Sequence, residues 1–338
     1  MQDYKDFLSK GERLLQEGRI SELRDHIETG AWELKAKAVT RTVEPYTIER
    51  LREDLATTVP GLETGYRTLD EFVRIPQEAL SIIAGRPSHG KTTLLMNLFL
   101  NVIKKYPERH FFFFSYQESV KKLAVKLITI LSGAVIDERF NVTQIGNYIS
   151  ENSTSNERIN EGIGKYRDVT EAKRLNLIDE HFYIDDLTDT IAHLSVHHPV
   201  GAIFIDYIQK VKTRGRYNTR ELEIQDISRQ LLEAALGLKI PIVVGAQFNR
   251  LVGSKKQVIE GTLREAGDIE QDANLVLGLW NETKNKEDEE RERIERRGTS
   301  HDKVVDLDLL ILKNRDGESN RTVTVTFNRP TLTITDKA

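Results

Sequence analysis

The sequence contains no cysteine among its 338 residues. Disulfides, zinc–thiolate sites and thiol catalysis are therefore excluded, and the composition suits a cytoplasmic setting. The sequence also lacks an apolar run long enough for a membrane span, and its N-terminus lacks the hydrophobic segment of a signal peptide, so no membrane association is expected. Basic residues are not in excess, since the net charge is −4 at pH 7. A nucleic-acid partner would therefore have to meet a local basic surface.

The first part of the chain is rich in charge and helical in pattern. Apolar residues recur at helical spacing, and glycines such as Gly11 and Gly18 interrupt them, so two or three short amphipathic helices are predicted. One more helix is predicted over 47–55. We expect 1–58 to form a helical N-terminal region that ends in this helix, and 59–338 to form the main domain. The apolar stripe of the N-terminal region packs either on its own chain or on a neighbouring subunit, because it needs a partner.

A phosphate-binding motif, G-x-x-x-x-G-K-[ST], lies between two apolar segments. The segment 80–84 is typical of a buried strand and 93–103 of a buried helix, which is the context that the motif requires. Backbone N–H groups of such a loop bind an anion at the helix N-terminus. Lys91 would face the β and γ phosphates, and the Thr92 hydroxyl would ligate Mg²⁺. The predicted nucleotide-binding residues are Gly85, Arg86, Pro87, Ser88, His89, Gly90, Lys91, Thr92 and Thr93.

Three further apolar segments end in polar side chains. The aromatic run 111–114 is followed by Gln117 and Glu118, and a later apolar run ends in Asp206, placed to reach the Mg²⁺ shell. A third run ends in Gln247, whose amide can sense a γ-phosphate. Ligands bind at the carboxyl ends of strands in doubly wound sheets, so these side chains belong near the phosphate loop. For Gln117 and Glu118, a strand end that simply enters a polar loop is the alternative.

A basic loop, 212–220, contains Arg214 and Arg216 together with one aromatic residue. This composition suits contact with a nucleic-acid backbone. A solvated basic turn is equally consistent with it.

The remaining segments carry no chemical motif. They comprise a polar helical stretch over 135–180, a short strand over 181–186, an amphipathic helix over 221–238, and strands over 307–313, 322–327 and 331–335, the last two forming a hairpin. A charge-rich insertion over 281–303 is predicted to be a solvated loop or a helix hairpin.

The ordered motifs resemble those of the DnaB-type replicative helicases, within the RecA-like ATPases, over roughly 60–336. The resemblance rests on 65–70, 86–93, 114–118, 204–209, 247–250, 263–273 and 313–317, of which 263–273 is the most specific. It implies an α/β fold, a RecA-like core with a mainly parallel twisted sheet and flanking helices, plus the small N-terminal helical region. It also implies a homo-hexameric ring that uses ATP and Mg²⁺ to move along single-stranded DNA, in a bacterial or phage-infected cell.

The resemblance implies roles for individual residues. Gln247 looks like the γ-phosphate sensor. Lys313 and Arg315 would reach from one subunit into the neighbour's nucleotide, Arg315 as an arginine finger. The residues implied to contact the DNA backbone in the ring channel are Arg264, Glu265 and Gly267.

Two departures from the family pattern matter. The family's water-orienting glutamate is Gln117 here, with Glu118 next to it, so either Glu118 serves or hydrolysis is weakened. Only about 60 residues precede the core, where the family has a larger helical domain for ring assembly and primase contact. Primase docking by that route is not expected, although a primase or a helicase loader is a candidate partner. The rival interpretations are a ring ATPase that acts as a binding or regulatory platform with weak hydrolysis, and a structural DNA-binding ring.

Overall fold

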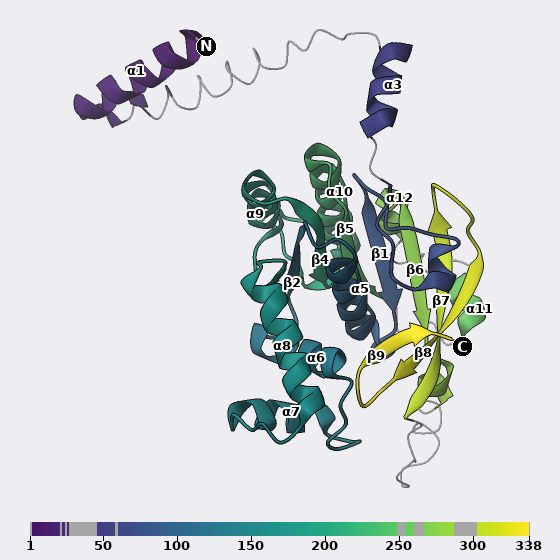
Figure 1. The fold of residues 1–338 in the computed structure, drawn as a ribbon. Helices are drawn as coiled ribbons and strands as arrows, with labels where there is room; N and C mark the ends of the chain where they lie inside the picture. The colour runs from purple at the N-terminus through teal and green to yellow at the C-terminus, as the bar shows by residue number, and fades with distance from the viewer. Residues whose placement is uncertain are drawn as a thin grey trace. The chain divides into compact units, whose positions relative to one another are not determined.

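The computed structural model divides the chain into two compact units, Met1–Thr58 and Val59–Ala338 (Figure 1). It describes residues 2–20, 22–23, 26, 46–57, 60–248, 254–259, 267–286 and 303–337. Within those ranges, every helix is too short or too polar to span a bilayer.

The first unit contains the helices α1 (Gln2–Gln16) and α3 (Ile48–Thr57). The break that we expected at Gly11 is wrong, because α1 runs through it; a single glycine costs a helix only about 1 kcal/mol relative to alanine. The helix ends instead before Gly18, whose φ of 69° is the left-handed conformation that terminates helices. The helix predicted over 47–55 is confirmed as α3. Its apolar Leu55 is exposed.

Among its described residues, the second unit is built on a nine-stranded sheet of order β3-β2-β4-β5-β1-β6-β7-β8-β9. Strands from β3 to β6 in that order run parallel, whereas β7, β8 and β9 alternate in direction. The predicted α/β fold with a mainly parallel sheet is confirmed. The strands are β1 (Leu80–Gly85), β2 (His110–Ser115), β3 (Leu175–Ile178), β4 (Val200–Asp206), β5 (Ile242–Gln247), β6 (Leu275–Trp280), β7 (Val304–Asn314), β8 (Arg321–Asn328) and β9 (Thr333–Asp336).

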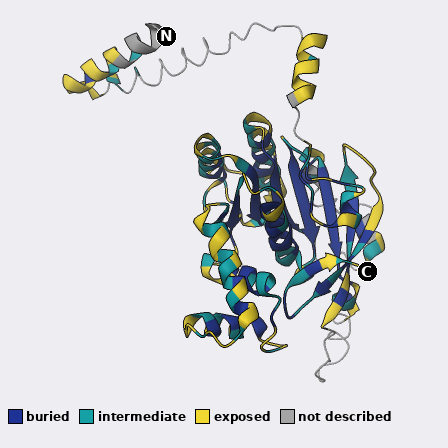
Figure 2. Ribbon diagram, viewed as in Figure 1, coloured by how far each residue is buried: buried dark blue, intermediate teal, exposed yellow. Residues whose placement is uncertain are grey.

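Helices cover both faces of this sheet, which explains why the parallel strands are continuous apolar runs. The aromatic run of β2 shows the division: Phe111 and Phe113 join the core beneath α5 (Lys91–Lys105), whereas Phe112 and Phe114 join the core beneath α9 and α10. The strands are buried and the outer sides of the helices are exposed (Figure 2). The other helices are α4 (Arg67–Asp70), α6 (Val120–Ser132), α7 (Asn141–Ser150), α8 (Glu157–Glu171), α9 (Ile184–His197), the 3₁₀ turn η1 (Ile208–Lys210), α10 (Arg220–Leu238), α11 (Lys255–Ile259) and α12 (Gly267–Asp272).

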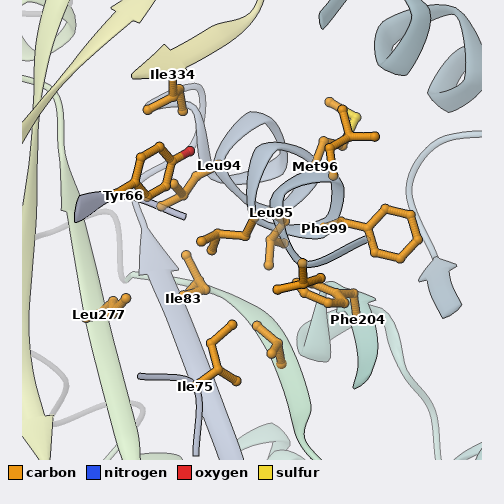
Figure 3. Close-up of a cluster of buried hydrophobic side chains, with 14 of the residues drawn as sticks. Tyr66, Ile75, Ile83, Leu94, Leu95, Met96, Phe99, Phe204, Leu277 and Ile334 are labelled. Carbon is orange, nitrogen blue, oxygen red and sulfur yellow. The ribbon is translucent and has the colours of Figure 1, made fainter. Parts of the chain in front are cut away.

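Helix α5, which follows the phosphate-binding motif, is held by a dense apolar core (Figure 3). Its Leu95 and Phe99 lie over Ile83 of β1 and Phe204 of β4. The Phe99 ring meets the rings of Phe113 and Phe204 edge-on, with centroids 5.4 and 5.3 Å away. Burying one such side chain contributes about 1.5–3 kcal/mol. This packing fixes the helix and therefore the loop that precedes it.

The strand predicted over 181–186 is wrong. The strand in this region is β3, which ends at Ile178, and residue 184 already begins α9. Asp185 and Asp186 lie in the first turn of α9, where the helix dipole favours negative charge. The acidic pair therefore belongs to a helix start, although it follows an apolar run as a strand-end carboxylate would.

The predicted C-terminal strands and hairpin are confirmed as β7, β8 and β9. Strand β9 and Leu332, just before it, are hydrogen-bonded to two helices. Asn97 of α5 donates to the Leu332 carbonyl at 2.9 Å and accepts from the Ile334 N–H at 3.0 Å. Asp336 accepts from the N–H groups of Arg67 and Thr68 at 3.0 and 3.1 Å, which caps α4. Strand β9 thus fixes both α4 and α5.

Candidate nucleotide site

The polar side chains predicted at strand ends meet at one edge of the sheet. In the parallel register, Gly85 of β1 pairs with Gln247 of β5, and Ser115 of β2 pairs with Asp206 of β4. The predicted strand–loop–helix context of the phosphate loop is confirmed. The edge therefore presents the loop, a carboxylate and an amide together.

The loop between β1 and α5 depends on a glycine at its last position. Gly90 precedes the first residue of α5 and has a φ of 102°, a conformation that other residues rarely adopt. Ser88 also has a positive φ, of 63°. The helix begins at Lys91, so its first N–H groups have no partner within the helix and can bind an anion.

The loop is also bonded to the segment after β6, which the sequence did not reveal. Arg86 donates a hydrogen bond to the Asn285 side-chain oxygen. The buried His89 accepts from the Asn281 N–H through Nδ1 at 3.2 Å, and its ring lies against that of Trp280. These contacts hold the loop against the segment after β6.

Lys91 is affected by burial and by the nearby Asp206 carboxylate, which act on its pKa in opposite directions. Its Nζ is 4.0 Å from the centre of the Tyr207 ring, a cation–π contact. Burial lowers the pKa of Lys91, and the neighbouring Asp206 partly offsets that effect. The ammonium is therefore poorly solvated before any ligand binds, and an anionic ligand would stabilise it.

Thr92 and Asp206 form the oxygen pair expected of a magnesium site. The Thr92 hydroxyl donates to Asp206 Oδ2 at 2.7 Å. The second carboxylate oxygen, Oδ1, is buried and has no hydrogen-bond partner among the described residues. Burial raises the pKa of Asp206, while the Thr92 hydrogen bond and the Lys91 charge lower it. An orphaned carboxylate oxygen beside a hydroxyl fits Mg²⁺, which prefers oxygen ligands and keeps several waters.

Glu118 lies in the turn after β2, the strand that pairs with β4. The strand ends at Ser115, so the condition for Glu118 to act, a strand that has already ended, is met. The Ser115 hydroxyl accepts from the Glu118 N–H at 3.1 Å and donates to its carbonyl at 2.7 Å, which fixes a tight turn. Burial raises the pKa of Asp206, and the charge of Glu118 raises it further. Gln117 is exposed.

Gln247 is held through its main chain by a residue whose role the sequence did not reveal. Gln209, in η1, accepts from the Gln247 N–H at 3.1 Å and donates to the Gln247 carbonyl at 3.2 Å. Both hydrogen bonds use main-chain atoms of Gln247, so they do not involve its side chain at the end of β5. The place of Gln209 at the end of the motif 204–209 was the signal available in the sequence.

Lys313 and Arg315 lie at the opposite edge of the sheet from the phosphate loop. Strand β7 runs antiparallel to β6, so its last residue, Asn314, pairs with Leu275, the first residue of β6. A six-residue strand spans roughly 20 Å, which separates these two cations from the loop of the same chain. Lys313 donates to the Gln271 carbonyl at 3.1 Å, and Arg315 donates to the same carbonyl at 2.7 Å.

The predicted DNA contacts are only partly described. Arg264 and Glu265 lie outside the described residues, and Gly267 is the first residue of α12. Arg214 forms two hydrogen bonds with the Asp186 carboxylate, at 3.0 and 2.6 Å. Arg216, on the same loop, is exposed.

The loop, the strand-end carboxylate and the order of the parallel strands define a P-loop ATPase of the RecA-like class. A family model described as "DnaB-like helicase C terminal domain" matches residues 61–336. The chain belongs to this family.

Individual relatives agree with this assignment. The chain is 27% identical over 299 residues to the replicative DNA helicase DnaB of Helicobacter pylori strain J99, an alignment that covers 80% of this chain and 59% of that protein. The chain thus spans less than two thirds of the length of that relative.

Two solved structures share the fold. One is a DnaB-like replicative helicase, described together with its interactions with primase; the TM-score is 0.73 at 17% identity, with 99% of this chain and 76% of the other covered. The other is an ATPase domain, with a TM-score of 0.69 at 19% identity, covering 87% of this chain and 100% of that domain.

Proposed function

We propose that this chain is the ATPase motor of a ring-shaped replicative DNA helicase. It hydrolyses ATP with Mg²⁺ and uses the energy to move along single-stranded DNA. Membership of the DnaB-like family supports this proposal, as does the replicative helicase activity named for its relatives.

The observation that carries the proposal is the distance between the two halves of the catalytic apparatus. Lys91, Thr92 and Asp206 lie at one edge of the sheet, and Lys313 and Arg315 lie at the other. An arginine finger stabilises charge on the transferred phosphoryl group only if it touches that group. A second copy of the chain is therefore needed to complete each site. Repeating that head-to-tail contact closes a ring, which we propose to be a hexamer.

We assign each step of ATP hydrolysis to particular residues of the chain. Lys91 would hold the β and γ phosphates, and Thr92 and Asp206 would hold Mg²⁺, which would neutralise charge developing on the phosphate oxygens. Glu118 orients the attacking water and accepts its proton. Gln247 senses the γ-phosphate, and Lys313 and Arg315 act on the neighbour's nucleotide.

The proposed partners follow from the same activity. We propose that Arg264, Glu265 and Gly267 contact the DNA backbone. Arg216 is a further candidate contact, and Arg214 would contribute only by leaving its pairing with Asp186. A primase or a helicase loader is a further proposed partner, supported by the likeness to the DnaB-like helicase described with its primase interactions. The bacterial relatives support a bacterial or phage-infected cell as the setting.

The test is to measure the ATPase rate with and without single-stranded DNA, beside unwinding of a forked duplex and particle mass. Stimulated hydrolysis, unwinding and an ATP-dependent ring would support the motor. Full activity from a monomer would contradict it.

A ring ATPase that acts mainly by binding is the second candidate. It is favoured by one feature, the glutamine at 117 where the family has its water-orienting glutamate. Tight binding of ATP and DNA with a turnover that DNA does not stimulate would support this alternative.

A further inference from the structure

The turn that carries Glu118 has a partner on the next helix. Lys126, in the second turn of α6, directs its Nζ to Glu118 Oε2 at 2.5 Å. Both side chains are only about a quarter exposed, at 24% and 23%. Side chains on a helix lean toward its N-terminus, so the long Lys126 side chain reaches back along α6 to the turn.

We propose that Lys126 is a positioning residue for Glu118: it holds the carboxylate at the nucleotide site and balances its charge beside Asp206. This inference rests on the proposed hydrolytic function. It adds a residue that neither the phosphate-loop motif nor the strand-end carboxylates point to.

The need for such a residue follows from the charges at the site. Glu118 follows β2, and Asp206 ends the neighbouring strand β4, so two carboxylates belong to the same edge of the sheet. Bound ATP would add further negative charge on the same side. The ammonium of Lys126, next to Glu118, offsets part of this negative charge.

The local backbone supports a precise role. The Ser115 bonds fix the Glu118 main chain, and the Tyr116 N–H donates to the Asp206 carbonyl at 2.8 Å, which ties the turn to β4. The Glu118 side chain still has three rotatable bonds, and the Lys126 contact restricts them.

The first experiment compares Lys126→Met, which keeps length and volume but removes the charge, with Lys126→Arg, which keeps the charge. Misplacing a catalytic group by about 1 Å can cost about 100-fold in rate, so Lys126→Met should lower kcat by up to about 100-fold. The KM for ATP should change little, and Lys126→Arg should restore most of kcat. Lys122→Met, at an exposed position one turn earlier on α6, is the matched control and should behave as wild type.

The second experiment asks whether Lys126 acts through Glu118. In a Glu118→Gln background, adding Lys126→Met should lower kcat little further, because the group that it positions is already gone. Losses that multiply in the double variant would overturn the inference. So would a normal kcat in Lys126→Met, or a raised KM with kcat intact, which would make Lys126 a nucleotide-binding residue.

Failure of this inference is distinguishable from failure of the proposed function. A wild-type protein that hydrolyses ATP beside an equally active Lys126→Met refutes only the role of Lys126. A wild-type protein without DNA-stimulated hydrolysis overturns the motor and, with it, the positioning role.

Discussion

The Thr92 hydroxyl donates a hydrogen bond of 2.7 Å to Asp206 Oδ2, which joins the first turn of α5 to the last residue of β4. The bond links the phosphate-binding helix to the strand-end carboxylate before any ligand is bound. Because Asp206 Oδ1 is buried and has no hydrogen-bond partner in the described part of the chain, the pair is arranged for a cation rather than for stability.

Replacing Asp206 with asparagine should stabilise the protein while removing its activity. Burial raises the pKa of Asp206, so folding penalises the ionised form, and that penalty lowers the free energy of unfolding at neutral pH. Asp206→Asn removes the penalty, so Tm without nucleotide should rise, by roughly 2–4 °C for each kcal/mol recovered. Mg²⁺-dependent turnover should be lost.

The direction of the pKa shift of Asp206 also fixes how this stabilisation depends on pH. As pH falls toward the raised pKa, the native wild type takes up the proton before the unfolded chain does, and the penalty disappears. The Tm difference between wild type and Asp206→Asn should therefore narrow in acid, as measured by thermal unfolding across pH. Asp168→Asn, at an exposed position on α8, should show no such difference. A lower Tm for Asp206→Asn at neutral pH would contradict the argument.

Lys91→Ala should abolish ATP turnover and leave the fold intact. Burial already lowers the pKa of Lys91, so losing its charge should not lower Tm. ATP hydrolysis and thermal unfolding measured together test this expectation. Lys104→Ala, at an exposed position near the end of the same helix, should retain full turnover. Normal hydrolysis by Lys91→Ala would overturn the site assignment.

Mixed rings should reveal a site shared between subunits. Arg315→Ala alone should lower turnover by about 10³–10⁵-fold, as for other arginine fingers. Mixing inactive Arg315→Ala subunits with inactive Lys91→Ala subunits should restore part of the activity, because some interfaces then combine an intact loop with an intact finger. Activity that never rises above that of the separate variants, despite subunit exchange, would argue against sharing.

The choice between Gln117 and Glu118 is open to a pair of single substitutions. Glu118→Gln should lower turnover by about 10²–10⁴-fold, the usual contribution of a general base, while nucleotide binding persists. Gln117→Glu should change turnover only modestly, because residue 117 is exposed. A harmless Glu118→Gln with a steep gain from Gln117→Glu would reverse the assignment and favour the weakly hydrolysing ring.

Arg264→Ala should weaken binding to single-stranded DNA equally for all sequences. Contacts to phosphate carry no base information, and losing one should flatten the salt dependence by about one unit of slope. Titrations with a labelled oligonucleotide at several salt concentrations measure both effects. The control is Arg158→Ala, at an exposed position on α8. An unchanged affinity and slope would remove 263–273 from the DNA path.

The layout of the candidate nucleotide site could be predicted from the sequence because its parts are local. The loop and its two flanking elements are contiguous, and Asp206 and Gln247 each end an apolar run. Parallel pairing then brings those ends to one edge without further information. Glu118 needed one more fact, where β2 ends, and no periodicity marks that residue.

Other contacts could not be predicted because they join distant segments through single side chains. The bond from Arg86 to Asn285 and the pair of Lys126 with Glu118 leave no pattern in composition or spacing. The wrong strand at 181–186 has a different cause. Acidic residues after an apolar run mark either a strand end or a helix start, and only the tertiary pairing of β3 with β2 decides between them.

The bonds from Asn97 to β9 also set an order of events during synthesis. The helix behind the phosphate loop is made early, yet two hydrogen bonds of its Asn97 side chain wait for residues 332 and 334. Chains at that stage, still lacking β9, hold α5 by its apolar face and by the side-chain bonds of Thr92 and Asn101. The last hydrogen bonds of α5 therefore form late on the ribosome, after nearly the whole second unit has emerged.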